Sequence, residues 1–106
     1  MDQLKGFQKR FLRGVAHPLK PVVFVGQKGF TQSLADAMDD ALDHHELVKV
    51  KFVDFKKKEM KLDLIEQIEK SVRCETVGLV GHIATFFRQQ SDPEKRKINL
   101  PSHADG

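Results

Sequence analysis

The sequence predicts an α/β fold in which a mixed four-stranded sheet packs against helices, with the elements in the order α-β-α-β-α-β-β. Segments with helical spacing of apolar residues alternate with short apolar or alternating segments. Strands separated by helices favour parallel pairing, whereas two strands joined by a tight turn must pair antiparallel. The 106 residues suit one domain, and 40% hydrophobic with 31% charged residues is ordinary for a folded protein.

The first predicted element is a helix over about residues 3–16. Its apolar face carries Leu4, Phe7, Phe11, Leu12 and Val15. Pro18 prevents the helix from continuing. Another face carries Lys5, Lys9 and Arg13 at a spacing of four, with Arg10 and His17 nearby. We therefore expect a helix with one apolar side and one basic side.

The predicted strands differ in their patterns. Residues 21–25 are fully apolar, which is typical of a buried inner strand. Residues 47–53 alternate, which directs Lys49 and Lys51 outward. Residues 75–80 and 83–88 form the last two strands, and the tight turn Gly81-His82 between them predicts a hairpin.

Two further helices lie between these strands. The first begins after Thr31, the expected N-cap, and its apolar face carries Leu34, Ala37, Met38, Ala41 and Leu42. Its outer face is acidic, with Asp36, Asp39, Asp40 and Asp43. The other helix begins after Asp54, ends near Val72, and has the apolar face Met60, Leu64, Ile65, Ile68 and Val72.

The chain divides into a domain over residues 1–88 and a tail over residues 89–106. The tail is polar, contains two prolines and shows no periodicity, so we expect it to be flexible. No apolar run approaches the roughly 20 residues of a membrane span. The single Cys74 excludes an internal disulfide and fits a reducing compartment, so we expect a cytoplasmic protein. We also expect a monomer without membrane contact.

The most informative segment is the loop Gly26-Gln27-Lys28-Gly29, between the apolar strand and the helix that begins after Thr31. Glycines permit a turn with positive φ and close approach of a ligand. A helix N-terminus offers unpaired N–H groups and a positive dipole, and Lys28 adds a cation. The segment therefore predicts a phosphate-binding site, with a plain tight turn as the alternative. KH domains also bind backbone through a Gly-x-x-Gly loop, but between two helices.

Positive charge is concentrated in two blocks. Residues 1–30 carry six Lys or Arg and one acid, residues 31–46 carry five acids and no Lys or Arg, and residues 47–61 carry six Lys and two acids. Such sidedness suits a protein that binds a polyanion with one face. We expect this polyanion to be RNA. Further candidates for contacts with it are Arg10, Arg13, His17, Lys20, Lys49 and Lys51. Together with Lys28 they could frame one groove. The alternative is that each charge is merely solvated.

The sequence shows no arrangement that points to catalysis, a metal or a cofactor. Five His and one Cys occur, but no pair has ligand spacing supported by a second pair. No nucleophile with its base is recognisable, nor a dinucleotide or P-loop motif. The aromatic residues are all Phe, and most lie on the predicted core faces. Phe30, directly after the Gly loop, is the exception: it either packs the second helix against the body, which we expect, or offers a stacking surface. Without exposed aromatics, base stacking is not the expected main mode of RNA recognition.

Several motifs together resemble one family. The residues concerned are Leu12-Arg13, Ala16-His17, Leu19-Lys20-Pro21-Val22-Val23, Gly26, Lys28, Gly29, Thr31, Ala41-Leu42, the run from His45 to Lys51, and Gly81. Over about residues 3–88 the chain resembles the bacterial YhbY-type proteins, the stand-alone form of the CRM (chloroplast RNA splicing and ribosome maturation) domain. The resemblance implies a fold similar to the C-terminal domain of translation initiation factor three.

The resemblance also implies RNA binding without catalysis. Bacterial members of the family associate with precursors of the large ribosomal subunit, and plant relatives serve in group II intron splicing. We therefore expect a ribosome assembly factor that binds precursor large-subunit rRNA and joins a pre-ribosomal particle. The alternatives are a binder of intron or small RNA with the same fold, and a protein-interaction module whose acidic helix docks a basic ribosomal protein.

Overall fold

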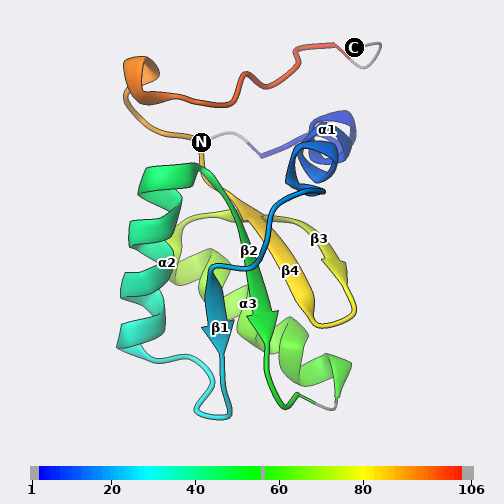
Figure 1. The fold of residues 1–106 in the computed structure, drawn as a ribbon, viewed down its shortest axis with the longest axis vertical. Helices are drawn as coiled ribbons and strands as arrows, with labels where there is room; N and C mark the ends of the chain where they lie inside the picture. The colour runs from blue at the N-terminus through cyan, green and yellow to red at the C-terminus, as the bar shows by residue number, and fades with distance from the viewer. Residues whose placement is uncertain (1–2, 56, 104–106) are drawn as a thin grey trace.

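The computed structural model describes residues 3–55 and 57–103 of the chain (Figure 1). The order of helices and strands predicted from the sequence is confirmed. The elements are α1 Gly6–Ala16, β1 Val23–Val25, α2 Gln32–His45, β2 Leu47–Phe52, α3 Lys58–Val72, β3 Glu75–Val80, β4 Ile83–Phe87 and the 3₁₀ turn η1 Pro93–Lys95.

The four strands form one mixed sheet in the order β1-β2-β4-β3. The β1–β2 pair is parallel, because α2 returns the chain to the end of the sheet where β1 began. The β2–β4 and β3–β4 pairs are antiparallel. At one end of the sheet, here called the loop end, residues 26–31 follow β1, and residues 53–55 and 57 follow β2. The opposite end is called the α1 end.

The larger core lies between the sheet and the helices α2 and α3, which both cover the same face (Figure 1). Met38 of α2 and Ile68 of α3 are fully buried there against Val50 and Phe86 of the sheet. Both helices owe their position to the apolar faces visible in their sequences. The C-cap of α2 is Glu46 at φ 61°, and that of α3 is Arg73 in the left-handed region.

A smaller core lies on the other face, where α1 packs across the α1 end of the sheet. Its buried members are Leu4, Leu12, Ala16, Leu47, Val77 and Phe87. The side chain of Gln8 accepts the backbone N–H of Lys5 at 2.9 Å, which fixes the first turn of α1. Because α1 is only 11 residues long, it leaves the loop end of this face uncovered.

The predicted apolar faces of two helices are partly wrong. In α1, Leu12 and Ala16 are buried, whereas Phe11 and Val15 are more than one third exposed. In α3, Met60 is exposed and Lys61 is buried in its place. The ammonium group of Lys61 donates to the carbonyl of Gly81 at 2.9 Å, so it fastens α3 to the β3–β4 turn. Gly81 has φ 59°, as the predicted hairpin turn requires.

The segment after Arg88 has specific contacts. Ile98 and Leu100 pack against the smaller core, and the backbone carbonyl of Pro101 accepts a hydrogen bond from Gln8 at 3.1 Å. Sequence reasoning did not anticipate these contacts, because it found no periodic pattern there. The division into residues 1–88 and 89–106 and the flexibility of the tail stay predictions.

Candidate nucleic-acid interface

The loop after β1 is a tight turn closed by one hydrogen bond. The backbone N–H of Gly29 donates to the carbonyl of Gly26 at 3.0 Å. Only Gly29 has a positive φ, at 70°, so the conformational freedom of glycine is needed at this residue and not at Gly26. The turn holds Gln27 and Lys28 at its tip, and both are exposed.

Thr31 begins α2 as predicted. Its hydroxyl oxygen accepts the backbone N–H of Leu34 at 3.1 Å, and its carbonyl accepts that of Ala35. This N-cap satisfies one of the first N–H groups of the helix, and the remaining ones are left to solvent or a ligand. The positive end of the helix dipole therefore lies directly behind the turn that carries Lys28.

A hollow of about 600 Å³ lies beside this turn. Residues of the turn line one side of it, α2 lines another, and Phe24 of β1 borders it as well. The lining is partly polar and partly apolar. A phosphate or a nucleotide seated there would meet the Gly loop and the start of α2, with Phe24 at the border.

The loop end also gathers cations from a second segment. The backbone N–H of Val53 donates to the carbonyl of Val25 at 2.8 Å, which places the residues after β2 beside the Gly loop. Lys57 and Lys58 follow in this segment and are exposed. Both lysines belong to the second basic block of the sequence, and their place at the loop end, which depends on the parallel pairing of β1 and β2, was not predicted.

Two of the predicted RNA-binding cations are engaged within the protein. The guanidinium group of Arg13 donates to the carbonyl of Val77 at 2.8 Å and crosses β3 over Gly78. The ammonium group of Lys49 donates to the carbonyls of His17 and Leu19, at 3.3 and 3.0 Å. Both side chains therefore fix α1 and the segment after it to the sheet.

The other predicted cations have side chains without a hydrogen bond or ion pair to another described residue. They are Arg10, His17, Lys20, Lys28 and Lys51. They do not form one compact group. Arg10 and His17 belong to the α1 end, whereas Lys28 lies at the loop end (Figure 1). The proximity of α1 to the Gly loop, expected from their closeness in sequence, was wrong, because the segment after α1 and then β1 run along the sheet between them.

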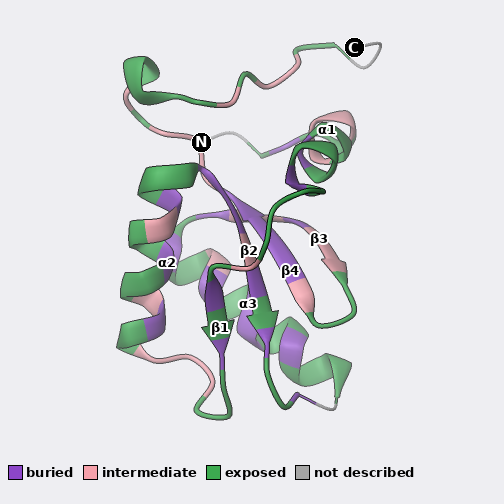
Figure 2. Ribbon diagram, in the orientation of Figure 1, coloured by how far each residue is buried: buried purple, intermediate pink, exposed green. Residues whose placement is uncertain are grey.

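The interpretation of β1 as a fully buried inner strand was also wrong. β1 is an edge strand, and only Val23 and Val25 are buried, whereas Phe24 is 61% exposed on the face that α1 leaves open (Figure 2). Phe30, expected either to pack the second helix against the body or to offer a stacking surface, packs partly buried against the larger core. An apolar run predicts a strand, but strand order decides which of its residues are exposed.

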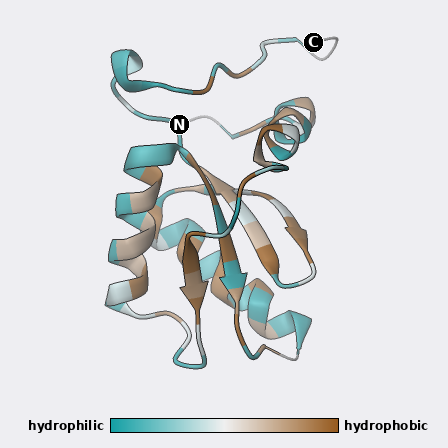
Figure 3. Ribbon diagram, viewed as in Figure 1, coloured by the Kyte–Doolittle hydropathy of each residue, from teal (hydrophilic) through white to brown (hydrophobic). Residues whose placement is uncertain are grey.

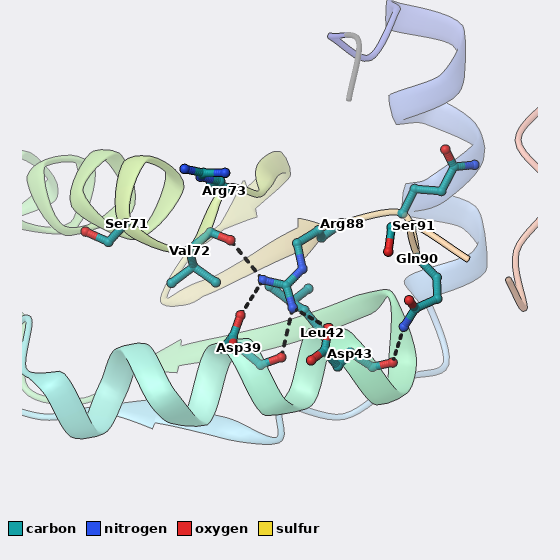
Figure 4. A pocket seen from close by; sticks show the side chains of 10 residues that line it. Asp39, Leu42, Asp43, Ser71, Val72, Arg73, Arg88, Gln90 and Ser91 are labelled. Carbon is teal, nitrogen blue, oxygen red and sulfur yellow. Dashed lines mark hydrogen bonds and ion pairs between the residues drawn. The ribbon is translucent and has the colours of Figure 1, made fainter. Parts of the chain in front are cut away.

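Some carboxylates on the acidic face of α2 are already paired with a cation of the same chain. The guanidinium group of Arg88 forms ion pairs with Asp39 at 2.6 Å and with Asp43 at 2.8 Å, in a cavity of about 420 Å³ (Figure 4). It also donates to the carbonyls of Asp39 and Val72, at 2.9 Å each. Half of the acids assigned to an outer face therefore hold the end of β4 against α2 and α3.

The groups with shifted pKa values, Cys74, Glu66 and Lys70, lie away from the Gly loop. Burial, and then the nearby carboxylate of Glu69, raises the pKa of the Cys74 thiol to about 12, so the thiol is protonated at neutral pH. On the exposed side of α3 the hydrogen bond with Lys70 lowers the pKa of Glu66, and the same bond raises the pKa of Lys70.

No described helix is both long and apolar enough to cross a bilayer.

Comparison with known proteins gives consistent matches along almost the whole chain. The model of the CRS1 / YhbY (CRM) domain family matches residues 4–88. A Haemophilus influenzae protein named "RNA-binding protein" is 40% identical over 101 residues, covering 95% of this chain and 98% of that one. The Bacillus subtilis protein named "Probable RNA-binding protein YqeI" is 34% identical over 98 residues, covering 92% and 99%.

A solved structure agrees with this result. The solution structure of the hypothetical protein SAV1595 from Staphylococcus aureus superposes with a TM-score of 0.79 at 30% identity, covering 93% of this chain and all of that one. The likeness in sequence and the likeness in fold therefore extend over the same part of the chain, from α1 into the tail.

Proposed function

Because this chain belongs to the CRS1 / YhbY (CRM) domain family, we propose that it binds RNA and associates with precursors of the large ribosomal subunit. RNA binding is supported by the family and by the names of relatives that match the chain almost from end to end. The choice of precursor rRNA rests on the resemblance to bacterial YhbY-type proteins. The proposed role is that of an assembly factor in the cytoplasm which acts by binding alone.

The observation that carries the proposal is the geometry at the loop end. An exposed Lys28 stands on a tight turn, directly before the capped N-terminus of α2, beside a hollow large enough for a phosphate and its sugar. Backbone N–H groups, a helix dipole and a cation are the usual means of holding a phosphate. Gly26 and Gly29 themselves carry no side chain that would obstruct the RNA backbone.

Further cations would extend the contact in two directions. Lys51, Lys57 and Lys58 surround the loop end, so they suit the phosphates next to the one held by the turn. Arg10, His17 and Lys20 lie towards the α1 end and suit a more distant part of a folded RNA. Phosphate contacts of this kind position a protein on RNA without reading its sequence.

Crosslinking in cells, followed by sequencing of the bound RNA, tests the proposal. We expect reads from precursor large-subunit rRNA to be enriched in the wild type and to fall in a Lys28→Glu variant. A matched control is Lys95→Glu, in the exposed turn η1 of the tail. Enrichment of introns or small RNAs in place of rRNA would favour the alternative RNA targets of the same fold.

The protein-docking alternative makes a different prediction. Association with pre-ribosomal particles that survives RNase treatment would favour docking of a basic ribosomal protein on the acidic face of α2. The ion pairs of Arg88 with Asp39 and Asp43 leave Asp36 and Asp40 as the acids of that face not bound to Arg88. A partner would therefore meet a weaker negative charge than the sequence alone suggests.

A further inference from the structure

The sheet has an uncovered apolar area on the face that carries α1. Towards the loop end of this face, Phe24 is 61% exposed and Val80 is 80% exposed. Figure 3 shows β1 as hydrophobic and the loop end of β2 as hydrophilic on this open part of the sheet. Large apolar side chains gathered on an open surface usually mark a binding site.

The strand register places three apolar side chains and one lysine of this area in one row. Phe24 of β1 is the neighbour of Lys51 of β2, Lys51 pairs with Ile83 of β4, and Ile83 pairs with Val80 of β3. The row therefore crosses all four strands and presents an aromatic ring, a cation and two branched aliphatic side chains. Since neighbouring strands lie about 4.8 Å apart, it is about 15 Å long.

The charge on this face favours a polyanion. Lys49 and Lys51 point to it from β2, and Lys51 makes no hydrogen bond or ion pair with another described residue. The one carboxylate on the described strand positions of this face belongs to Glu75, at the α1 end, where both its oxygens accept the backbone N–H of Leu4 at 3.0 Å. An apolar protein surface docked on the row would have to bury Lys51 without a partner, which is unfavourable.

The row is continuous with the Gly loop. Phe24 borders the same hollow as Gly26 and Lys28, and only one residue separates it from Gly26. An RNA strand that has one phosphate held at the turn would therefore bring the attached base to the edge of the Phe24 ring. Such a combination of a cationic backbone site with an aromatic platform is the general design of single-strand binding surfaces.

We propose that the row Phe24–Lys51–Ile83–Val80 stacks unpaired bases of an RNA strand whose backbone is held at the Gly loop. This inference rests on the RNA binding proposed above and adds a preference for single-stranded RNA over duplex. In a duplex the base faces are already stacked and cannot lie on Phe24. The expected recognition is tolerant of sequence, because every base offers a flat aromatic face.

The absence of Trp and Tyr from the chain makes a direct test possible. A Phe24→Trp variant carries one indole on the row, and a Phe11→Trp variant carries one at an exposed position of α1. Each is titrated with an unstructured 12-nucleotide RNA and with a duplex of the same length. We expect quenching of the indole emission at position 24 by the single strand alone, and little change at position 11.

Affinity measurements supply the second readout. Phe24→Ala should bind the single strand about fivefold to a hundredfold more weakly than the wild type, as expected for loss of one aromatic stacking partner, and should bind the duplex unchanged. Phe24→Tyr keeps the ring and should retain the affinity. Because Phe24 is exposed, circular dichroism should show all variants folded.

The outcomes separate this inference from the proposed function. Unchanged single-strand affinity in Phe24→Ala, with the effect of Lys28→Glu intact, would overturn base stacking and leave RNA binding standing. Failure of the wild type to bind any RNA would overturn both. An indole emission at position 24 that shifts with protein concentration alone would mean that a second copy covers the row, and would overturn the inference as well.

Discussion

The buried carboxylate of Glu46 accepts the backbone N–H of Lys97 at 2.7 Å, across 51 positions of the sequence. The same carboxylate accepts the N–H groups of Gln90, at 2.7 Å, and Ile98, at 3.1 Å. Glu46 is thus the point at which the end of α2 holds the segment after β4. It is 1% exposed and lies within the run from His45 to Lys51, one of the motifs in which the chain resembles its family.

Replacing Glu46 with Gln should release the tail while leaving the larger core in place. The amide keeps one acceptor oxygen but turns two N–H donors towards N–H groups of the tail, so buried donors are left unpaired. We expect hydrogen exchange at the amides of Lys97 and Ile98 to accelerate, and the free energy of unfolding to fall by about 1–3 kcal/mol. Glu94→Gln, at an exposed position of η1, is the control. Unchanged exchange would show that Ile98 and Leu100 hold the tail without Glu46.

At the Gly loop, both Lys28→Ala and Lys28→Glu should weaken binding of rRNA fragments, and Lys28→Glu should weaken it more. The reason is that Ala removes a cation, whereas Glu adds a repelling charge at the proposed phosphate site. Fluorescence polarisation measures the affinity, and circular dichroism should show both variants folded because Lys28 is exposed. If Lys28→Glu binds as tightly as Lys95→Glu, the loop does not hold a phosphate.

Salt should weaken RNA binding steeply. If the cations of the loop end and α1 neutralise about five phosphates, the logarithm of the association constant should fall with the logarithm of salt concentration at a slope of about −3 to −5. Lys28→Ala should make this slope shallower by about 1, since one phosphate contact is lost. A slope near zero for the wild type would mean that contacts other than phosphates carry the affinity.

The face of the molecule that meets RNA can be tested by reversing charges on its two sides. Asp36 and Asp40 of α2 are exposed and not bound to Arg88, so their replacement by Lys should leave the fold and the specific binding largely intact. Replacing Arg10 and Lys20 with Glu should remove most of the association with large-subunit precursors, measured by sedimentation. The reverse pattern would favour the acidic face of α2 as the interface.

Cys74 should make the protein less stable in alkali. Its pKa is 9.0 ordinarily and about 12 in the folded protein, so between these values the unfolded chain releases the thiol proton and the folded chain keeps it. The free energy of unfolding therefore decreases as pH rises above about 9, by at most about 1.4 kcal/mol per pH unit from this group. Urea unfolding at pH 8, 9 and 10 should show a steeper decrease in the wild type than in Cys74→Ala. Parallel curves would contradict the shift.

Sequence periodicity was sufficient to predict the order of elements, the mixed sheet and the N-cap at Thr31. These features depend on local spacing and on the chemistry of single residues, such as the hydroxyl that caps α2. The exposure of Phe11 and the burial of Lys61 were not predictable in the same way. The exposure of Phe11 depends on how little of the sheet the short α1 covers. The burial of Lys61 depends on the carbonyl of Gly81, which the β3–β4 turn supplies.

The candidate site was predictable in its centre but not in its surroundings. Gly26, Lys28, Gly29 and Thr31 are contiguous in sequence, so their arrangement follows from a turn and a cap. The engagement of Arg13 and Lys49 in bonds to distant carbonyls could not be foreseen, because charge patterns do not distinguish a bonded cation from a free one. The exposure of Phe24 depended on strand order, which no single segment encodes.

The smaller core has a consequence for the way the chain folds during synthesis. The larger core is complete once Phe86 has emerged from the ribosome, because all its buried members lie between Val23 and Phe86. The smaller core joins Leu4 near the start of the chain to Leu100 near its end. A nascent chain can therefore form the sheet with α2 and α3 while α1 still lacks its last packing partners. Of the three α-helices described, α1 is synthesised first and is the last to be fully enclosed.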